Sequence, residues 1–157
     1  MKRKQMTMQI QKTITQPLEF NFPVEPVAVQ SARFFRCGKG VRSYQPEKVT
    51  NFKQLLRIYA LQQLPENFEI FTQPLKLEAE FVFLPPKSMR KRDLQKIQDG
   101  GIVYKPSRPD LTDNLLKGCC DALTKTVWSD DALICEVHSI KRYGTKPFIR
   151  LIVSPLF

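Results

Sequence analysis

Apolar and polar residues alternate along several segments of the chain, and such alternation predicts β-strands that bury one face. In the clearest segment, residues 75–83, apolar side chains fill every second position, and lysine or glutamate separates them over the first half. Residues 18–26 and 133–143 alternate in a similar way, whereas residues 148–153 are almost all apolar, which is typical of an interior strand. Two β-prone runs on either side of Gly38-Lys39-Gly40 predict a hairpin.

Apolar residues recur at helical spacing in two further segments. The first begins at Pro46 and ends before Pro65, and the second covers residues 110–123. With about five or six strands and two long helices, the pattern predicts an α+β fold of two layers, in which helices pack on one face of a mixed β-sheet.

The chain of 157 residues has the length of a single domain, and we expect residues 1–157 to form one. The polar and basic residues 1–16 predict a flexible end or an edge strand. Residues 87–100 form a second basic segment, and its sequence is compatible with either a short helix or a mobile arm. We expect a cytoplasmic protein with reduced thiols, because no apolar run approaches the roughly 20 residues of a membrane span or resembles a secretory signal.

The balance of charge narrows the choice of partners. There are 25 Lys and Arg residues against 15 Asp and Glu residues, a net charge of +10 that favours nucleic acid or an anionic membrane surface. His138 is the only histidine, so sites that need two or more histidines are excluded. Gly38 and Gly40 lack the third glycine of a dinucleotide fingerprint, and we expect no nucleotide cofactor.

Against this positive background, five aspartates fall within residues 110–131. At about 100° per residue, Asp113, Lys117 and Asp121 share one arc of a helix, opposite an apolar arc. Mg²⁺ prefers oxygen ligands, and it often takes one or two carboxylates and completes its shell with water and substrate phosphate. The pattern therefore fits a metal site for phosphodiester hydrolysis, in which Lys117 stabilises negative charge.

The same residues also have ordinary structural explanations. Asp110 follows Pro109 at a helix start, where a capping aspartate is common, and Asp113 would favour the helix dipole there. Asp113 and Lys117 stand at the spacing of a surface ion pair, and Asp130-Asp131 fits a turn. Helix geometry by itself leaves both explanations open.

In their order and spacing, these residues resemble the signature of the RusA-type Holliday junction resolvases. Upstream, a strand followed by prolines, an Arg-Phe run, Gly-Lys-Gly and a tyrosine before a helix is similar to the pattern of the phage and prophage members. The resemblance covers roughly residues 18–153. The positions that carry it most specifically are Pro109-Asp110-Leu111-Thr112-Asp113-Asn114-Leu115-Leu116-Lys117, Asp121-Ala122-Leu123, Trp128-Ser129-Asp130-Asp131 and Lys141.

The resemblance implies a RusA-like fold and a Mg²⁺-dependent endonuclease, with Mn²⁺ able to substitute. It also implies a homodimer whose subunits each nick one strand of a four-way DNA junction, during recombination and repair in a prophage or its host. The alternatives are a non-catalytic protein that binds branched DNA and a nuclease that prefers other branched DNA, such as flaps or forks.

By position, the resemblance also implies roles for single residues. Asp113 and Asp131 would bind the metal, with Asp130 beside Asp131 as a further metal-binding carboxylate, and Lys117 would be the catalytic lysine. Of the neighbouring residues, Asp121 and Asn114 would support the site or be structural, and Lys141 would contact phosphate.

Asp110 is a further implied metal ligand, but its spacing is unusual. The family has Asp-x-Asp-Asn, whereas Thr112 places one more residue between Asp110 and Asp113 here. If the segment is extended, the insertion turns the Asp110 side chain to the other side; if it is helical, the two carboxylates stay together.

Basic residues mark two candidate DNA-binding segments. The basic residues of the predicted hairpin would contact the phosphates of the junction, or one of its aromatic rings would stack on an unpaired base. The alternative is that the hairpin is solvated and its phenylalanine rings belong to the core. The segment 87–100 would become ordered on DNA or be a solvated run of charge. Together with Lys141, the candidate DNA contacts are Arg33, Arg36, Lys39, Arg42, Lys87, Arg90, Lys91 and Arg92.

Overall fold

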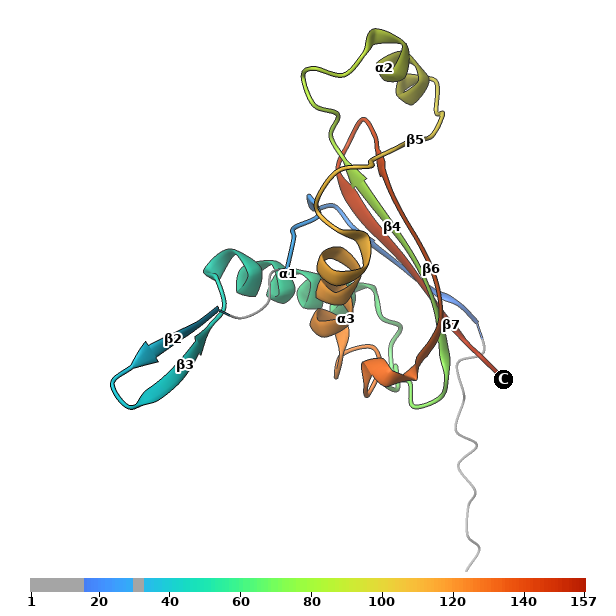
Figure 1. Cartoon of the computed structure of the whole chain (residues 1–157). Helices are drawn as coiled ribbons and strands as arrows, with labels where there is room; N and C mark the ends of the chain where they lie inside the picture. Colours follow the sequence, from blue (N-terminus) through green and yellow to red (C-terminus); the bar gives the residue numbers. More distant parts are fainter. Residues whose placement is uncertain (1–15, 30–32) are drawn as a thin grey trace, which may run out of the picture.

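The computed structural model describes residues 16–29 and 33–157, so the prediction for residues 1–16 falls almost entirely outside the described residues (Figure 1). Its main sheet consists of β1 (Leu18–Phe22), β4 (Leu75–Phe83), β5 (Val103–Tyr104), β6 (Ile134–Tyr143) and β7 (Phe148–Pro155). The strand order is β1-β7-β4-β6-β5. Because β4 is parallel to β6 while the other neighbours are antiparallel, the sheet is mixed, as predicted.

Two helices, α1 (Glu47–Gln63) and α3 (Lys117–Leu123), pack against each other and share the core with the sheet (Figure 1). A π-helical turn, η1 (Leu111–Leu116), leads directly into α3, and a short 3₁₀ turn, η2 (Asp131–Leu133), precedes β6. The packing of helices on a mixed sheet confirms the predicted α+β fold. Within residues 16–29 and 33–157, no helix is both long enough and apolar enough to cross a membrane.

The alternation in residues 75–83 sets the position of the core. Leu77 and Phe81 of β4 are fully buried, whereas Glu78 between them is half-buried on the opposite side of the strand. β7 lies between β1 and β4, which agrees with the interior strand predicted from the apolar run 148–153. Fully burying a side chain of this size stabilises the fold by about 1.5–3 kcal/mol. Trp128, after α3, is also completely buried and belongs to this core.

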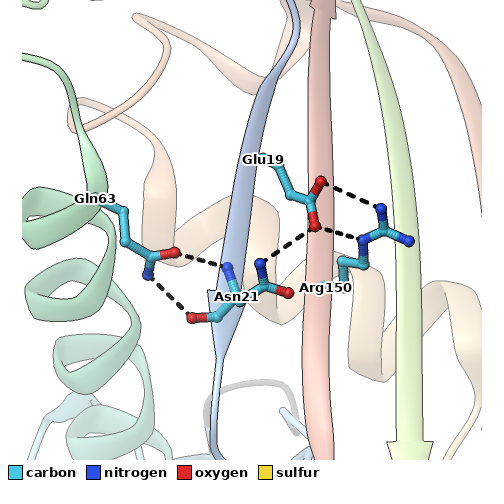
Figure 2. A network of polar contacts seen from close by, with 4 residues as sticks. All are labelled: Glu19, Asn21, Gln63 and Arg150. Atoms are coloured by element: carbon cyan, nitrogen blue, oxygen red, sulfur yellow. Dashed lines mark hydrogen bonds and ion pairs between the residues drawn. The ribbon is translucent and has the colours of Figure 1, made fainter.

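The outer edge of β1 is covered by a side chain of α1 (Figure 2). The Asn21 N–H donates to Gln63 Oε1 at 2.8 Å, and Gln63 Nε2 donates to the Asn21 carbonyl at 3.0 Å. On the neighbouring strand, the Arg150 guanidinium donates to both carboxylate oxygens of Glu19, at 2.7 and 3.2 Å. Gln63 thus satisfies main-chain groups that an edge strand leaves open, and it ties the end of α1 to the sheet.

The basic segment 87–100 forms the short helix that was one of its two open alternatives. This helix, α2 (Lys91–Gln98), buries Ile97 and lies beyond the end of β4, apart from α1 and α3 (Figure 1). β5, which follows it, was not predicted, because a strand of two residues carries no alternation that could reveal it.

The predicted hairpin is present as β2 (Arg33–Cys37) and β3 (Gly40–Tyr44). At its turn, Gly38 has a φ of 60°, a conformation that glycine adopts without strain. The two strands form a separate sheet that projects from the layered part of the molecule near the start of α1 (Figure 1). We refer to residues 33–44 as the ribbon.

Candidate active site

The helix predicted over residues 110–123 is present, but its first part is not α-helical. Residues 111–116 form the π-helical turn η1, in which the Leu115 N–H donates to the Asp110 carbonyl, five residues back, at 3.2 Å. A π turn holds more residues than an α turn, and π turns are commonly found at functional sites. The turn contains Thr112, the residue by which this segment exceeds the Asp-x-Asp-Asn spacing.

The predicted separation into an apolar and a polar face is confirmed. Leu115, Cys119 and Leu123 are buried in the core, while Asp113 and Lys117 are exposed. η1 also contacts β6, and α3 contacts α1. Because the apolar face is held from two sides, the polar face is presented to solvent in a fixed orientation.

Two of the ordinary explanations for the aspartates do not hold for Asp110 and Asp113. Asp110 occupies the N-cap position of η1, but its side chain makes no capping hydrogen bond; its Oδ2 instead lies 3.4 Å from Asn114 Nδ2. Among the ion pairs of the described residues, none joins Asp113 to Lys117 within 4.0 Å. Both carboxylates are exposed. Asp113 lies in the first turn of η1, where its charge favours the helix dipole, but its carboxylate has no ion-pair partner among the described residues.

Asp121 and Asp130, by contrast, have structural roles. Asp121 accepts a hydrogen bond from Lys53 of α1 at 3.1 Å, which joins α3 to α1. Asp130 Oδ1 accepts from the Ala132 N–H at 2.9 Å and so caps η2. This hydrogen bond lowers the pKa of Asp130, because it stabilises the ionised carboxylate.

Asp131 is the first residue of η2 and is exposed, and its charge contributes to the raised pKa of Cys120 on α3. Burial raises the pKa of the Cys120 thiol to about 12, and the carboxylates of Asp131 and Asp121 add to this shift. The acidic residues without an ion-pair partner in the described part of the chain include Asp110, Asp113 and Asp131, three of the four implied metal ligands.

The chemistry of these side chains fits Mg²⁺, although they do not form a closed cage. Among residues 16–29 and 33–157, no three His, Cys, Asp or Glu side chains gather closely enough to hold one metal ion. Mg²⁺ does not need such a cluster, since it keeps several waters and often binds one or two carboxylates and substrate phosphate. It is therefore the chemistry of the side chains, and not their arrangement, that fits Mg²⁺ here.

Lys141 of β6, for which a phosphate contact was predicted, makes contacts within the chain. Its ammonium donates to the Ser107 carbonyl at 2.8 Å and to the Pro109 carbonyl at 2.7 Å. Lys105 donates to the Arg108 carbonyl and to Ser107 Oγ, both at 2.6 Å. The two lysines thus fix the backbone of residues 107–109, which leads directly into Asp110. Sequence reasoning missed Lys105, because no motif marks it.

The predicted DNA contacts lie in two separate places (Figure 1). On the ribbon, Arg36, Lys39 and Arg42 are exposed, and Arg33 lies in β2 but its side chain is outside the described part. The second group is at and before α2, where the basic side chains are also exposed. Of these, Arg90 and Arg92 contact Asp93 at 3.8 and 3.5 Å. The exposed members of this second group are Lys87, Arg90, Lys91 and Arg92.

Two comparisons with known proteins bear on this site. The family model described as "Endodeoxyribonuclease RusA" matches residues 23–154, which include every element from β4 to β6. A protein of Bacillus subtilis (strain 168), described as "Uncharacterized protein YqaN", is 30% identical over 138 residues, which cover 87% of this chain and 94% of YqaN. The resemblance seen in the motifs is thereby confirmed, and the chain belongs to the RusA endodeoxyribonuclease family.

Proposed function

We propose that this chain is a Mg²⁺-dependent endonuclease that resolves four-way DNA junctions by paired, symmetric nicks, acting as a homodimer in recombination and repair. One observation carries the proposal: in a protein of net charge +10, three exposed carboxylates at the motif positions have no ion-pair partner among the described residues. Unpaired carboxylates are suited to bind a divalent cation. The positive charge on the rest of the protein is suited to bind a polyanionic substrate. The whole chain would form one nuclease domain.

In this proposal, Asp113 and Asp131 hold the metal ion, with Mn²⁺ able to replace Mg²⁺. Asp110, which is not gathered with them in the described structure, would become a third ligand only when metal and substrate bind. The bound ion supplies charge neutralisation and lowers the pKa of water. Asn114, 3.4 Å from Asp110, would orient that carboxylate. Asp130 would assist only secondarily, because its carboxylate already caps η2.

Lys117 would act on the phosphate itself. Its side chain is exposed, one turn after Asp113, and no carboxylate of the described residues pairs with it. A free ammonium at this position can stabilise the negative charge that develops as the phosphodiester is attacked. The basic side chains of the ribbon and of α2 would bind the junction backbone and supply most of the affinity.

The test is to replace Asp113 by asparagine and to measure cleavage and binding of a synthetic four-way junction. Asp113→Asn should abolish the paired nicks in Mg²⁺ but keep junction binding, because it removes no cation that contacts phosphate. Glu66→Gln, an exposed acidic residue in the turn after α1, is the control and should still cut. Cleavage at the wild-type rate by Asp113→Asn would refute the assignment of the metal ligand.

The wild type separates this function from its alternatives. Junction binding without nicks, with or without Mg²⁺, would indicate a branched-DNA-binding protein that lost cutting, for which the Thr112 insertion would be the first cause to examine. Competition between a four-way junction, a flap and a fork of equal length would reveal a preference for other branched DNA.

A further inference from the structure

The ribbon exposes large apolar side chains that no part of the described molecule covers. The exposed fractions are 73% for Phe34, 52% for Phe35, 66% for Val41 and 54% for Tyr44. Apolar groups gathered in this way on a projecting element mark a contact surface, because a soluble domain gains nothing by leaving them in water. The prediction left open whether these rings belong to the core, and their exposure shows that they do not.

Each face of the ribbon carries an aromatic ring beside a cation. Cross-strand partners point to the same side, and Phe34 is opposite Ser43 while Arg36 is opposite Val41. The other face carries Phe35 opposite Arg42, and Tyr44 follows on the same side. A two-stranded ribbon of this kind can enter a DNA groove, and here both faces would meet the nucleic acid.

Charge selects among the partners that would cover such a surface. Residues 33–44 contain four basic residues and no acidic residue. A second copy of this basic ribbon would be repelled, whereas a polyanion is attracted. The aromatic rings add a second requirement, since a base must expose a flat face before a ring can stack on it.

We propose that the ribbon enters the branch point of the DNA, where Phe34 and Phe35 stack on bases that are not stacked on a neighbouring base pair. Arg36, Lys39 and Arg42 then contact the surrounding phosphates. Linear duplex offers the phosphates but not the open base faces, so the rings give selectivity for branched DNA while the cations give affinity. This inference rests on the proposed function and assigns its choice of substrate to two side chains.

The experiment compares three variants of the full chain in binding to a four-way junction and to linear duplex of equal length, over a range of salt. Phe34→Ala/Phe35→Ala should lose about tenfold or more in junction affinity, keep its duplex affinity and keep its salt dependence. Arg36→Ala/Lys39→Ala/Arg42→Ala should weaken both substrates, with the slope of log K against log salt falling by about 0.9 per lost phosphate contact. Val41→Ser, on the same face as Phe34, is the control and should keep its selectivity, because it removes apolar surface without removing a ring.

A fluorescent base analogue at the branch point gives a direct readout. Its emission should change on binding of the wild type, as expected for a new stacking partner, and should not change with Phe34→Ala/Phe35→Ala. The ribbon lies outside the core, so the melting temperature of each variant should match that of the wild type.

Three results would overturn the inference. The first is a double phenylalanine variant that keeps its preference for the junction, and the second is one that loses junction and duplex binding equally. The third is a variant that no longer forms dimers in sedimentation, because the ribbon would then be a contact between two copies of the chain. If the wild type itself does not bind a junction, the proposed function fails. If the wild type binds and the phenylalanine variant remains selective, only the role of the ribbon fails.

Discussion

Replacing Lys141 by methionine should loosen the backbone that leads into Asp110. The lysine ammonium donates to the carbonyls of Ser107 and Pro109 at 2.8 and 2.7 Å, and methionine fills similar space without a donor. A hydrogen bond with a charged partner contributes about 1.5–3 kcal/mol. Ser107 is exposed, so water can replace its bond, whereas Pro109 is half-buried. The expected loss is therefore that of one bond, about 2 kcal/mol, or about 30-fold in local opening.

Hydrogen exchange in the metal-free protein measures this opening directly. The Leu115 amide donates to the Asp110 carbonyl, so its exchange should become about 30-fold faster in Lys141→Met if η1 opens with the loop. The Mg²⁺ concentration for half-maximal cleavage should rise in the same variant. Lys105→Met, which removes the second clamp, should change both quantities in the same direction. Lys146→Met, an exposed lysine in the turn before β7, is the control and should leave them unchanged.

The competing explanation is that Lys141 binds DNA phosphate. In that case Lys141→Met would lower the salt dependence of junction binding by about 0.9, and the exchange of the Leu115 amide would be unchanged. Our account predicts the opposite combination, an unchanged salt dependence with faster exchange. The observation of the first combination would refute the positioning role.

Two further predictions concern packing and thiol chemistry. Gly118→Ala should lower the free energy of unfolding, measured in urea, by about 1–3 kcal/mol, because a Cβ there would lie 2.3 Å from Val29 Cγ2. Gly40→Ala is the control and should change the free energy of unfolding little, because the nearest atom to its Cβ would be 3.7 Å away. Equal effects of the two substitutions would contradict the packing of Gly118 against Val29. A thiol reagent at pH 8 should modify only the exposed Cys37 and Cys135 in the native protein, and all four cysteines after unfolding. Cys119 is buried, and the pKa of Cys120 of about 12 leaves almost no reactive thiolate. A third reactive thiol in the native protein would show that α3 opens.

Much of the fold could be predicted because burial of one face of a strand or helix requires apolar residues at regular intervals in the sequence. The alternation in residues 75–83 and the continuous apolar run at 148–153 identified β4 and the interior β7. The π-helical turn could not be predicted in this way, since an angle of about 100° per residue presupposes an α-helix. The π-helical turn that contains Thr112 changes the hydrogen-bond pattern without changing which residues are apolar.

The sequence marks the residues of the candidate site but gives none of their contacts. The spacing of Asp110, Asp113 and Asp131 is visible in the sequence, whereas the partner of Asp121 is Lys53, on a different helix. Likewise, nothing in the spacing indicates that Lys141 binds carbonyls more than thirty residues away rather than phosphate. Such polar contacts depend on tertiary packing, which alone decides which of several similar aspartates stay free.

The central claim is that free carboxylates at η1 and η2 hold a divalent cation, and a crystal of the protein with junction DNA and Mn²⁺ tests it most directly. Anomalous scattering should place a manganese ion about 2.0–2.6 Å from carboxylate oxygens of both Asp113 and Asp131, beside a DNA phosphate. A crystal with ordered DNA and manganese bound elsewhere, with these two carboxylates pointing apart into solvent, would contradict the account.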